Sequence, residues 1–133
     1  MPNTHLRTLR ALLFSLSVTA SLSAQSADPK SIPVIDGGIG PCTADFTITD
    51  SSNIPIYNAK IKVHIAYGTL SIRKLDLEVS TNADGKGRFT GLPNKLKRGL
   101  FFEASQADLQ AEAFDDPSKN CTAQFTLALQ KPQ

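Results

Sequence analysis

The sequence contains no tryptophan, one methionine at its first position, two cysteines and two histidines. One histidine, His5, lies in the N-terminal segment, so the rest of the chain carries only His64. Ser-His-Asp and Cys-His catalysis each require a histidine base, and a zinc site requires three or four His, Cys or carboxylate ligands. We therefore expect a protein that is not an enzyme, with no catalytic residues, no metal and no cofactor.

The chain also lacks an excess of charge of either sign. Its formal net charge of +2 includes Arg7 and Arg10, and without these two residues the basic and acidic side chains are equal in number. Proteins that bind nucleic acid usually carry a clear basic excess, so no nucleic-acid partner is expected. A chain of 133 residues can build one modest core but not a second domain or a large substrate chamber.

The N-terminal segment, residues 1–24, has the pattern of a signal peptide. Residues 1–10 are basic without any acidic side chain, and residues 11–18 form an apolar run that is too short to span a bilayer. Small side chains follow, so cleavage is expected between positions 20 and 26, with Ala24 favoured. No later run is long and apolar enough to cross a membrane, and we expect a periplasmic or secreted protein. The alternative is a buried amphipathic helix.

Residues 25–41 contain three prolines and three glycines and show no hydrophobic period. This composition is typical of a flexible linker or an extended lead-in segment. The apolar residues Ile32, Val34 and Ile35 leave a second possibility, in which a short piece of this segment pairs with the edge of a sheet.

From Cys42 to about residue 130 the apolar side chains recur at every second position, as they do along strands with one buried face. In the longest run, Tyr57, Ala59, Ile61, Val63, Ile65 and Tyr67 would face inward. Turn residues separate the runs, including Asn82-Ala83-Asp84-Gly85, which predicts a tight hairpin. Seven strands are expected, near residues 44–49, 57–67, 74–79, 87–90, 100–105, 109–114 and 123–129. This series predicts an all-β domain, a seven-stranded antiparallel β-sandwich.

The two cysteines flank this domain, because Cys42 precedes its first strand and Cys121 opens its last. Two cysteines in an exported protein are most simply a disulfide. If the first and last strands are parallel neighbours, their N-terminal ends meet and the bridge can form. Closing a loop of this length would stabilise the fold by roughly 4 kcal/mol.

Several of these segments together resemble the carboxypeptidase regulatory-like domain family. The resemblance rests on residues 46–50, 55–61, 81–89 and 91–93, which include a Thr-x-x-Asp-Gly hairpin and span most of residues 44–93. It implies a prealbumin-like or Ig-like sandwich, found as an accessory module in secreted and envelope proteins, and no catalytic residues. The chain departs from the family after Pro93, where a basic loop replaces the usual Gly-x-Tyr start of a hairpin.

That basic loop is the one local cluster of charge, with Lys95, Lys97 and Arg98 close together in residues 94–99. It could contact an acidic partner or serve only to solubilise the domain. His64 is expected to be a solvated strand residue beside Lys60 and Lys62.

Two other candidate sites have little support from the residues. The segment Asn82–Gly85 overlaps a calcium loop but fails the template at Ser80 and Gly91. A carboxylate pair for glycoside cleavage could come from Glu103, Glu112 and Asp115, but no apolar cleft is predicted around them.

The sequence therefore favours an exported, non-catalytic module that binds or scaffolds, with an unknown protein or carbohydrate partner in the envelope and an undetermined oligomeric state. A second hypothesis is a transthyretin-like carrier of a small apolar ligand, acting as an oligomer. It needs an exposed apolar face, and strand parity points Phe101, Phe114 and Ile56 away from the core. A hydrolase is the third and least favoured hypothesis.

Overall fold

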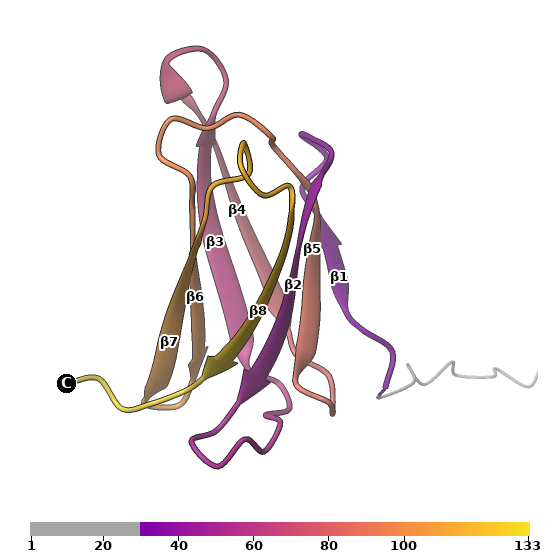
Figure 1. The fold of residues 1–133 in the computed structure, drawn as a ribbon, viewed down its shortest axis with the longest axis vertical. Coiled ribbons are helices and arrows are strands. Elements are labelled where there is room, and N and C mark those ends of the chain that lie inside the picture. Colours follow the sequence, from indigo (N-terminus) through magenta and orange to yellow (C-terminus); the bar gives the residue numbers. More distant parts are fainter. Residues whose placement is uncertain (1–29) are drawn as a thin grey trace, which may run out of the picture.

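The computed structural model describes residues 30–133, and within them the chain forms eight strands and one short 3-10 turn (Figure 1). The predicted signal peptide lies outside the described residues. The strands are β1 (Val34–Asp36), β2 (Cys42–Thr49), β3 (Lys60–Tyr67), β4 (Arg73–Ser80), β5 (Lys86–Leu92), β6 (Leu100–Gln106), β7 (Leu109–Asp115) and β8 (Thr122–Ala128). The 3-10 turn, η1, spans Thr69–Ser71 between β3 and β4.

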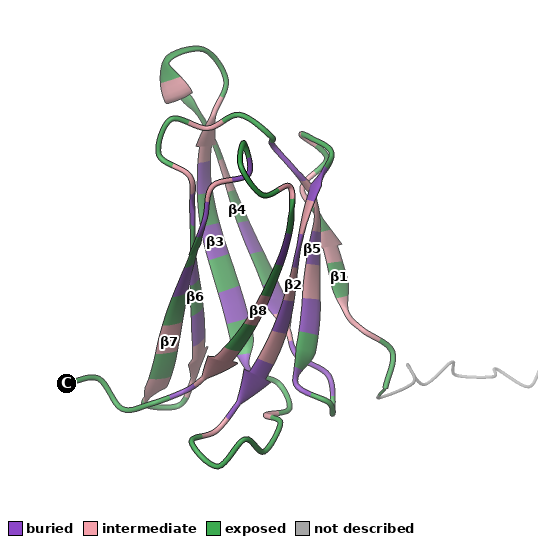
Figure 2. Ribbon diagram, in the orientation of Figure 1, coloured by how far each residue is buried: buried purple, intermediate pink, exposed green. Residues whose placement is uncertain are grey.

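The strands form two four-stranded sheets, in the order β1-β5-β2-β8 and β4-β3-β6-β7, called here sheet A and sheet B. Phenylalanine rings fill the space between them. Phe46 of sheet A lies 4.8 Å, between ring centroids, from Phe102 of sheet B, and Phe89 lies 5.4 Å from Phe102. Figure 2 shows buried and exposed residues alternating along β3, as an extended strand with one covered face requires. The prediction of an all-β, two-layered domain is confirmed.

Sheet A is mixed rather than wholly antiparallel. Its central strand β2 pairs antiparallel with β5 and parallel with β8, from Thr43 opposite Thr122 to Thr49 opposite Ala128. The parallel pairing brings the N-terminal ends of β2 and β8 together, and the predicted disulfide between Cys42 and Cys121 forms there, with the two Cα atoms 4.6 Å apart.

The eighth strand is β1, which lies in the segment 25–41. Of the two possibilities for that segment, its described part follows the second, because β1 pairs parallel with the edge of β5 through Val34–Asp36. The residues just before β1 are also held, because the side-chain amide of Asn82 donates to the backbone carbonyls of Lys30 and Ser31, at 3.0 and 3.1 Å. The seven-strand prediction was therefore short by this one parallel edge strand.

The turn between β4 and β5 is held by two buried polar side chains, Thr81 and Asn82. Thr81 Oγ1 donates to the Ile56 carbonyl at 2.6 Å and accepts from the Ala59 amide at 2.9 Å. Asn82 Oδ1 accepts from the amides of Asp84 and Lys86. A tight turn forms at Asn82–Gly85 as expected, but the predicted hairpin is wrong, because β4 belongs to sheet B and β5 to sheet A, so the turn carries the chain from one sheet to the other. The Thr and Asn of its motif join this turn to the preceding loop and to the N-terminal segment.

Two expectations about individual side chains were wrong. Tyr57 lies before β3 and is 64% exposed, because the chain turns at Asn58, whose φ is 60°, and the strand begins only at Lys60. Ile56 was expected to point away from the core, but it is half-buried and packs against it. Its backbone hydrogen bonds to Ile48 and Thr81 hold it there.

Removing the disulfide by the double substitution Cys42→Ala/Cys121→Ala should lower the free energy of unfolding by roughly 4 kcal/mol, because the unfolded chain regains the entropy of a long open loop. Urea unfolding of the oxidised wild-type protein and the variant measures the difference. The wild-type protein should also melt at a lower temperature with reductant than without it, and equal melting temperatures would contradict a stabilising bridge.

Candidate functional site

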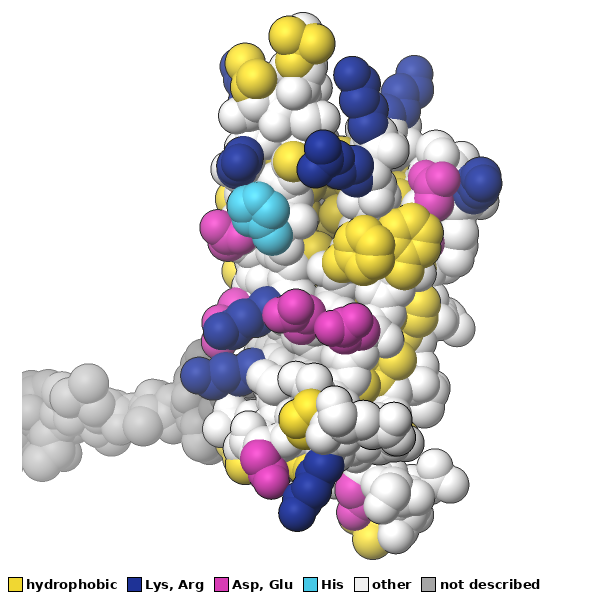
Figure 3. Space-filling view, turned by 90° about the vertical axis from the view of Figure 1, so that its left-hand side faces the viewer, with side chains coloured by type: hydrophobic (Ala, Val, Ile, Leu, Met, Phe, Trp, Pro, Cys, Tyr) yellow, Lys and Arg dark blue, Asp and Glu magenta, His cyan; other side chains and the backbone are white. Residues whose placement is uncertain are grey.

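The outer face of sheet B carries an exposed aromatic pair. Phe101 of β6 and Phe114 of β7 are partners in the strand register, their ring centroids lie 4.8 Å apart, and they are 62% and 51% exposed. The prediction that both point away from the core is confirmed. Figure 3 shows this face, where a hydrophobic patch lies between basic side chains on one side and acidic side chains on the other.

Acidic side chains lie on one side of this pair, two residues from Phe101 along β6 and two residues from Phe114 along β7. Glu103 of β6 is directly opposite Glu112 of β7, an arrangement that places like charges side by side. Within residues 30–133 neither carboxylate forms an ion pair, since the nearby Lys62 pairs instead with Glu78 at 3.7 Å. We call the register row Glu78, Lys62, Glu103 and Glu112 the acidic row.

Basic side chains lie on the other side of the aromatic pair, around a hollow of about 660 Å³. Its lining includes Lys74 from β4, and Lys97 and Arg98 from the loop before β6. We call these three side chains the basic cluster. None of these three forms an ion pair with another residue of the described chain. Apolar surface adjoins them, because Phe101 and the 76% exposed Leu70 line the same hollow.

Two loops at one end of the sandwich form the walls of this hollow. The loop before β6 is anchored by Leu96, which is half-buried against the core, so the cations on either side of it project outward. The turn between β3 and β4 places Leu70 in a left-handed conformation, with φ of 59°. Of the predicted binding loop, Lys97 and Arg98 line the hollow, whereas Lys95 lines a neighbouring hollow of about 370 Å³.

His64 lies on the same outer face, and its Nδ1 is 2.5 Å from Asp76 Oδ1. Both side chains are exposed, to 55% and 80%, so the pair is solvated. Ser71 lines the same hollow as His64, but no hydrogen bond joins His64 to a serine in the part of the chain that the structure describes.

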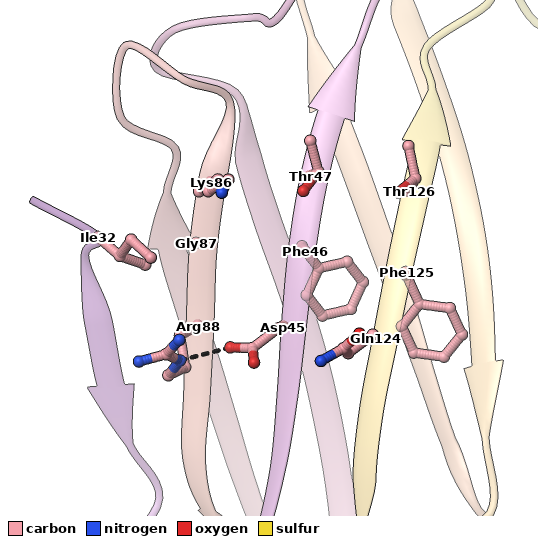
Figure 4. A pocket seen from close by; sticks show the side chains of 10 residues that line it. All are labelled: Ile32, Asp45, Phe46, Thr47, Lys86, Gly87, Arg88, Gln124, Phe125 and Thr126. Atoms are coloured by element: carbon pink, nitrogen blue, oxygen red, sulfur yellow. Dashed lines mark hydrogen bonds and ion pairs between the residues drawn. The ribbon is translucent and has the colours of Figure 1, made fainter. Parts of the chain in front are cut away.

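The outer face of sheet A offers a second, more polar hollow of about 470 Å³ (Figure 4). Arg88 of β5 and Asp45 of β2 form an ion pair across its floor. Neutral polar side chains such as Thr47, Gln124 and Thr126 surround the pair. Arg88 and Asp45 thus neutralise each other at the centre of this surface. On sheet B, in contrast, Glu103, Glu112 and the basic cluster form no ion pairs within the described residues.

The three carboxylates considered for glycoside cleavage do not converge. Glu103 and Glu112 lie on the outer face, whereas Asp115 ends β7 and is 6% exposed. Burial raises the pKa of Asp115, and the adjacent Asp116 raises it further. The Ser118 hydroxyl, which donates to Asp116 at 2.7 Å, lowers the pKa of Asp116.

Residues 30–133 contain no group of three or more His, Cys, Asp or Glu side chains placed to hold a metal ion. The same residues contain no helix that is long and apolar enough to cross a membrane.

No protein-family model matches the sequence, and neither does any curated protein. Solved structures of similar shape include 3-chlorocatechol 1,2-dioxygenase from Rhodococcus opacus 1CP, with 11% identity, a TM-score of 0.46, and coverage of 78% of this chain and 65% of that one. Another is catechol 1,2-dioxygenase from Pseudomonas arvilla C-1, with 13% identity, a TM-score of 0.46, and coverage of 78% and 59%. The chain spans less than two thirds of each, and likenesses this distant carry no argument about function.

The raised pKa of Asp115 predicts a pH-dependent stability. As pH rises past about 3.9, the usual pKa of an unfolded Asp, the unfolded state ionises first, so the folded state loses stability until the pH exceeds the folded pKa. Asp115→Asn removes this loss and should gain stability over the wild type at pH 7 but not at pH 3, measured by urea unfolding. Asp116→Asn is the control, and it should lose stability at pH 7, because the pKa of Asp116 is lowered in the folded state. A gain in stability for both variants at pH 7 would contradict a raised pKa of Asp115.

Proposed function

We propose that this chain is an exported, non-catalytic β-sandwich module that binds or scaffolds in the cell envelope or extracellular space, with the outer face of sheet B as its binding surface. The sandwich would be of the prealbumin-like or Ig-like type, as the resemblance to carboxypeptidase regulatory-like domains implies. The observation that carries the proposal is the exposed pair Phe101 and Phe114, with unmatched charges on both sides.

Such a surface is unfavourable for an isolated domain. The two phenyl rings remain 62% and 51% exposed, so covering the rest of each could contribute roughly half of the 1.5–3 kcal/mol that full burial of a phenyl side chain provides. The facing pair Glu103 and Glu112 adds repulsion where an opposite-charge pair would stabilise the sheet by up to about 1 kcal/mol. Local conflicts of this kind are expected at functional surfaces, where a partner supplies the missing contacts.

The disulfide between Cys42 and Cys121 supports the export part of the proposal. Stable disulfides belong to oxidising compartments, such as the periplasm and the extracellular space. This agrees with the signal peptide expected over residues 1–24.

The exposed aromatic pair also favours a second candidate, the transthyretin-like carrier of a small apolar ligand. The hollow beside Phe101 has the volume of a small-molecule site. Ile56 does not contribute, since it packs against the core, which leaves only Phe101 and Phe114 of the predicted apolar face. A carrier should retain a small molecule through purification, and native mass spectrometry detects it.

The contact of His64 with Asp76 is the one observation that favours a hydrolase. Both side chains are exposed, however, and no serine of residues 30–133 is hydrogen-bonded to His64, so the contact lacks the nucleophile that such catalysis needs. Any hydrolase activity of this chain would have to disappear in His64→Ala.

The binding surface can be tested by placing a photoreactive phenylalanine analogue at position 101 of the protein in its native host. We expect irradiation to attach a recurring partner at this position, because Phe101 lies at the centre of the proposed surface. The same analogue at position 124, on the outer face of sheet A, is the matched control. Absence of adducts at 101, or equal adducts at both positions, would contradict the proposed surface.

A further inference from the structure

We propose that the partner bound by this surface is a second copy of the same chain, packed face to face on sheet B with the strands of the two copies antiparallel. The inference rests on the proposed function, since it names the occupant of the same surface. It follows from the way charge is distributed around the aromatic pair.

On β4 and at β6, charges of opposite sign lie on the two sides of one row of the sheet. Asp76 pairs with His64, and Phe101 with Phe114. The β3–β6 pairing ends at Val63 opposite Phe102, and continuing it by one residue brings His64 level with Phe101, so we call these four residues the central row. The acidic row lies two residues from it in one direction, about 7 Å along the strands. The basic cluster lies on the opposite side, with Lys74 two residues and Arg98 three residues away along the chain.

A twofold axis that lies in the interface plane, perpendicular to the strands and along the central row, makes the charges of β4 and β6 self-complementary. It places Phe101 on the partner's Phe101 and Phe114 on the partner's Phe114. It also brings Glu103 to the partner's Arg98 and Glu78 to the partner's Lys74, and the symmetry repeats each contact. The same rotation sets Glu112 opposite the partner's Asp116 and Asp76 opposite the partner's Asp76, so four opposite-charge contacts act against three like-charge contacts. The hollow beside Phe101 would then receive acidic side chains of the other copy.

The other face-to-face arrangement, with the twofold axis parallel to the strands, is disfavoured. It would place the acidic row against the acidic row and the basic cluster against the basic cluster. Like charges brought together at an interface cost several kcal/mol, so charge selects the antiparallel arrangement.

A second copy also fits the surface better than a purely acidic partner. An acidic protein would match Lys97 and Arg98, but it would meet Glu103 and Glu112 with charge of the same sign. A partner with both charges, at the same spacing on either side of an apolar centre, matches the acidic row and the basic cluster together. This chain presents that pattern on β4 and β6, through Glu78 with Lys74 and Glu103 with Arg98, whereas β7 carries carboxylates on both sides of Phe114.

The size of the surface predicts a weak dimer. Four strands about 4.8 Å apart and about 27 Å long give a face of roughly 500 Å². Two such faces bury about 1,000 Å² together, near the lower end for specific complexes. Association should therefore depend on concentration in the micromolar range and weaken with added salt.

Sedimentation velocity of the full mature chain over a concentration series tests the proposal with two charge reversals, Glu103→Arg and Arg98→Glu. The wild type should dimerise, and each variant alone should associate at least about tenfold more weakly, because each places like charges together at both symmetric contacts. An equimolar mixture of the two variants should regain the dimer, since both contacts then join opposite charges. Gln124→Arg, on the outer face of sheet A, is the control and should dimerise as the wild type does.

The mixture also controls for folding, because a variant that failed to fold could not restore association. A wild-type chain that stays monomeric at all concentrations overturns the proposal, as does a mixture that fails to regain the dimer although each variant melts cooperatively like the wild type. A dimer that retains a small molecule between its copies overturns the direct aromatic contact and favours the carrier. The photo-crosslink at position 101 separates the two claims, since an adduct to a different protein keeps the binding surface and rejects the second copy.

Discussion

The two-residue period of an extended strand decides which side chains of this domain fill the core and which meet solvent. In β6 it directs Phe102 between the sheets and leaves the adjacent Phe101 62% exposed, although the two side chains are identical. A slip of one residue would exchange these roles along the whole strand. Core packing therefore fixes the register, and the register in turn assembles the outer face of sheet B.

Strand pairing turns this local period into a surface. Because β6 pairs with β7 in register, Phe101 meets Phe114 and Glu103 meets Glu112. Side chains far apart in the sequence thus form successive apolar and acidic rows. The loops at one end of the sandwich complete the surface, where Lys97 and Arg98 lie beside Phe101. The proposed binding function and the proposed self-association both depend on this order.

Much of the fold could be predicted from the sequence, because alternation, turn residues and cysteine positions are local signals. They identified seven of the eight strands, the tight turn before β5 and the disulfide between Cys42 and Cys121. They did not show that this turn crosses between the sheets, because that depends on which strands pair. Parity alone also predicted that Phe101 and Phe114 are exposed. The parallel pairing of β1 left no signal beyond a few apolar residues among prolines and glycines. The burial of Ile56 depends on hydrogen bonds to β2 and Thr81, which no local pattern shows.

The candidate site was less predictable, because it depends on pairing between strands. The sequence singled out Lys95, Lys97 and Arg98 but not Lys74, which joins the last two only when β4 packs beside β3. The most direct test of the underlying register compares Phe101→Asp with Phe102→Asp by urea unfolding. Phe102→Asp should unfold the domain or destabilise it by more than about 4 kcal/mol, because it buries an unpaired charge, whereas Phe101→Asp should leave a folded protein. Similar losses in both variants would contradict the division of sheet B into a core face and a binding face.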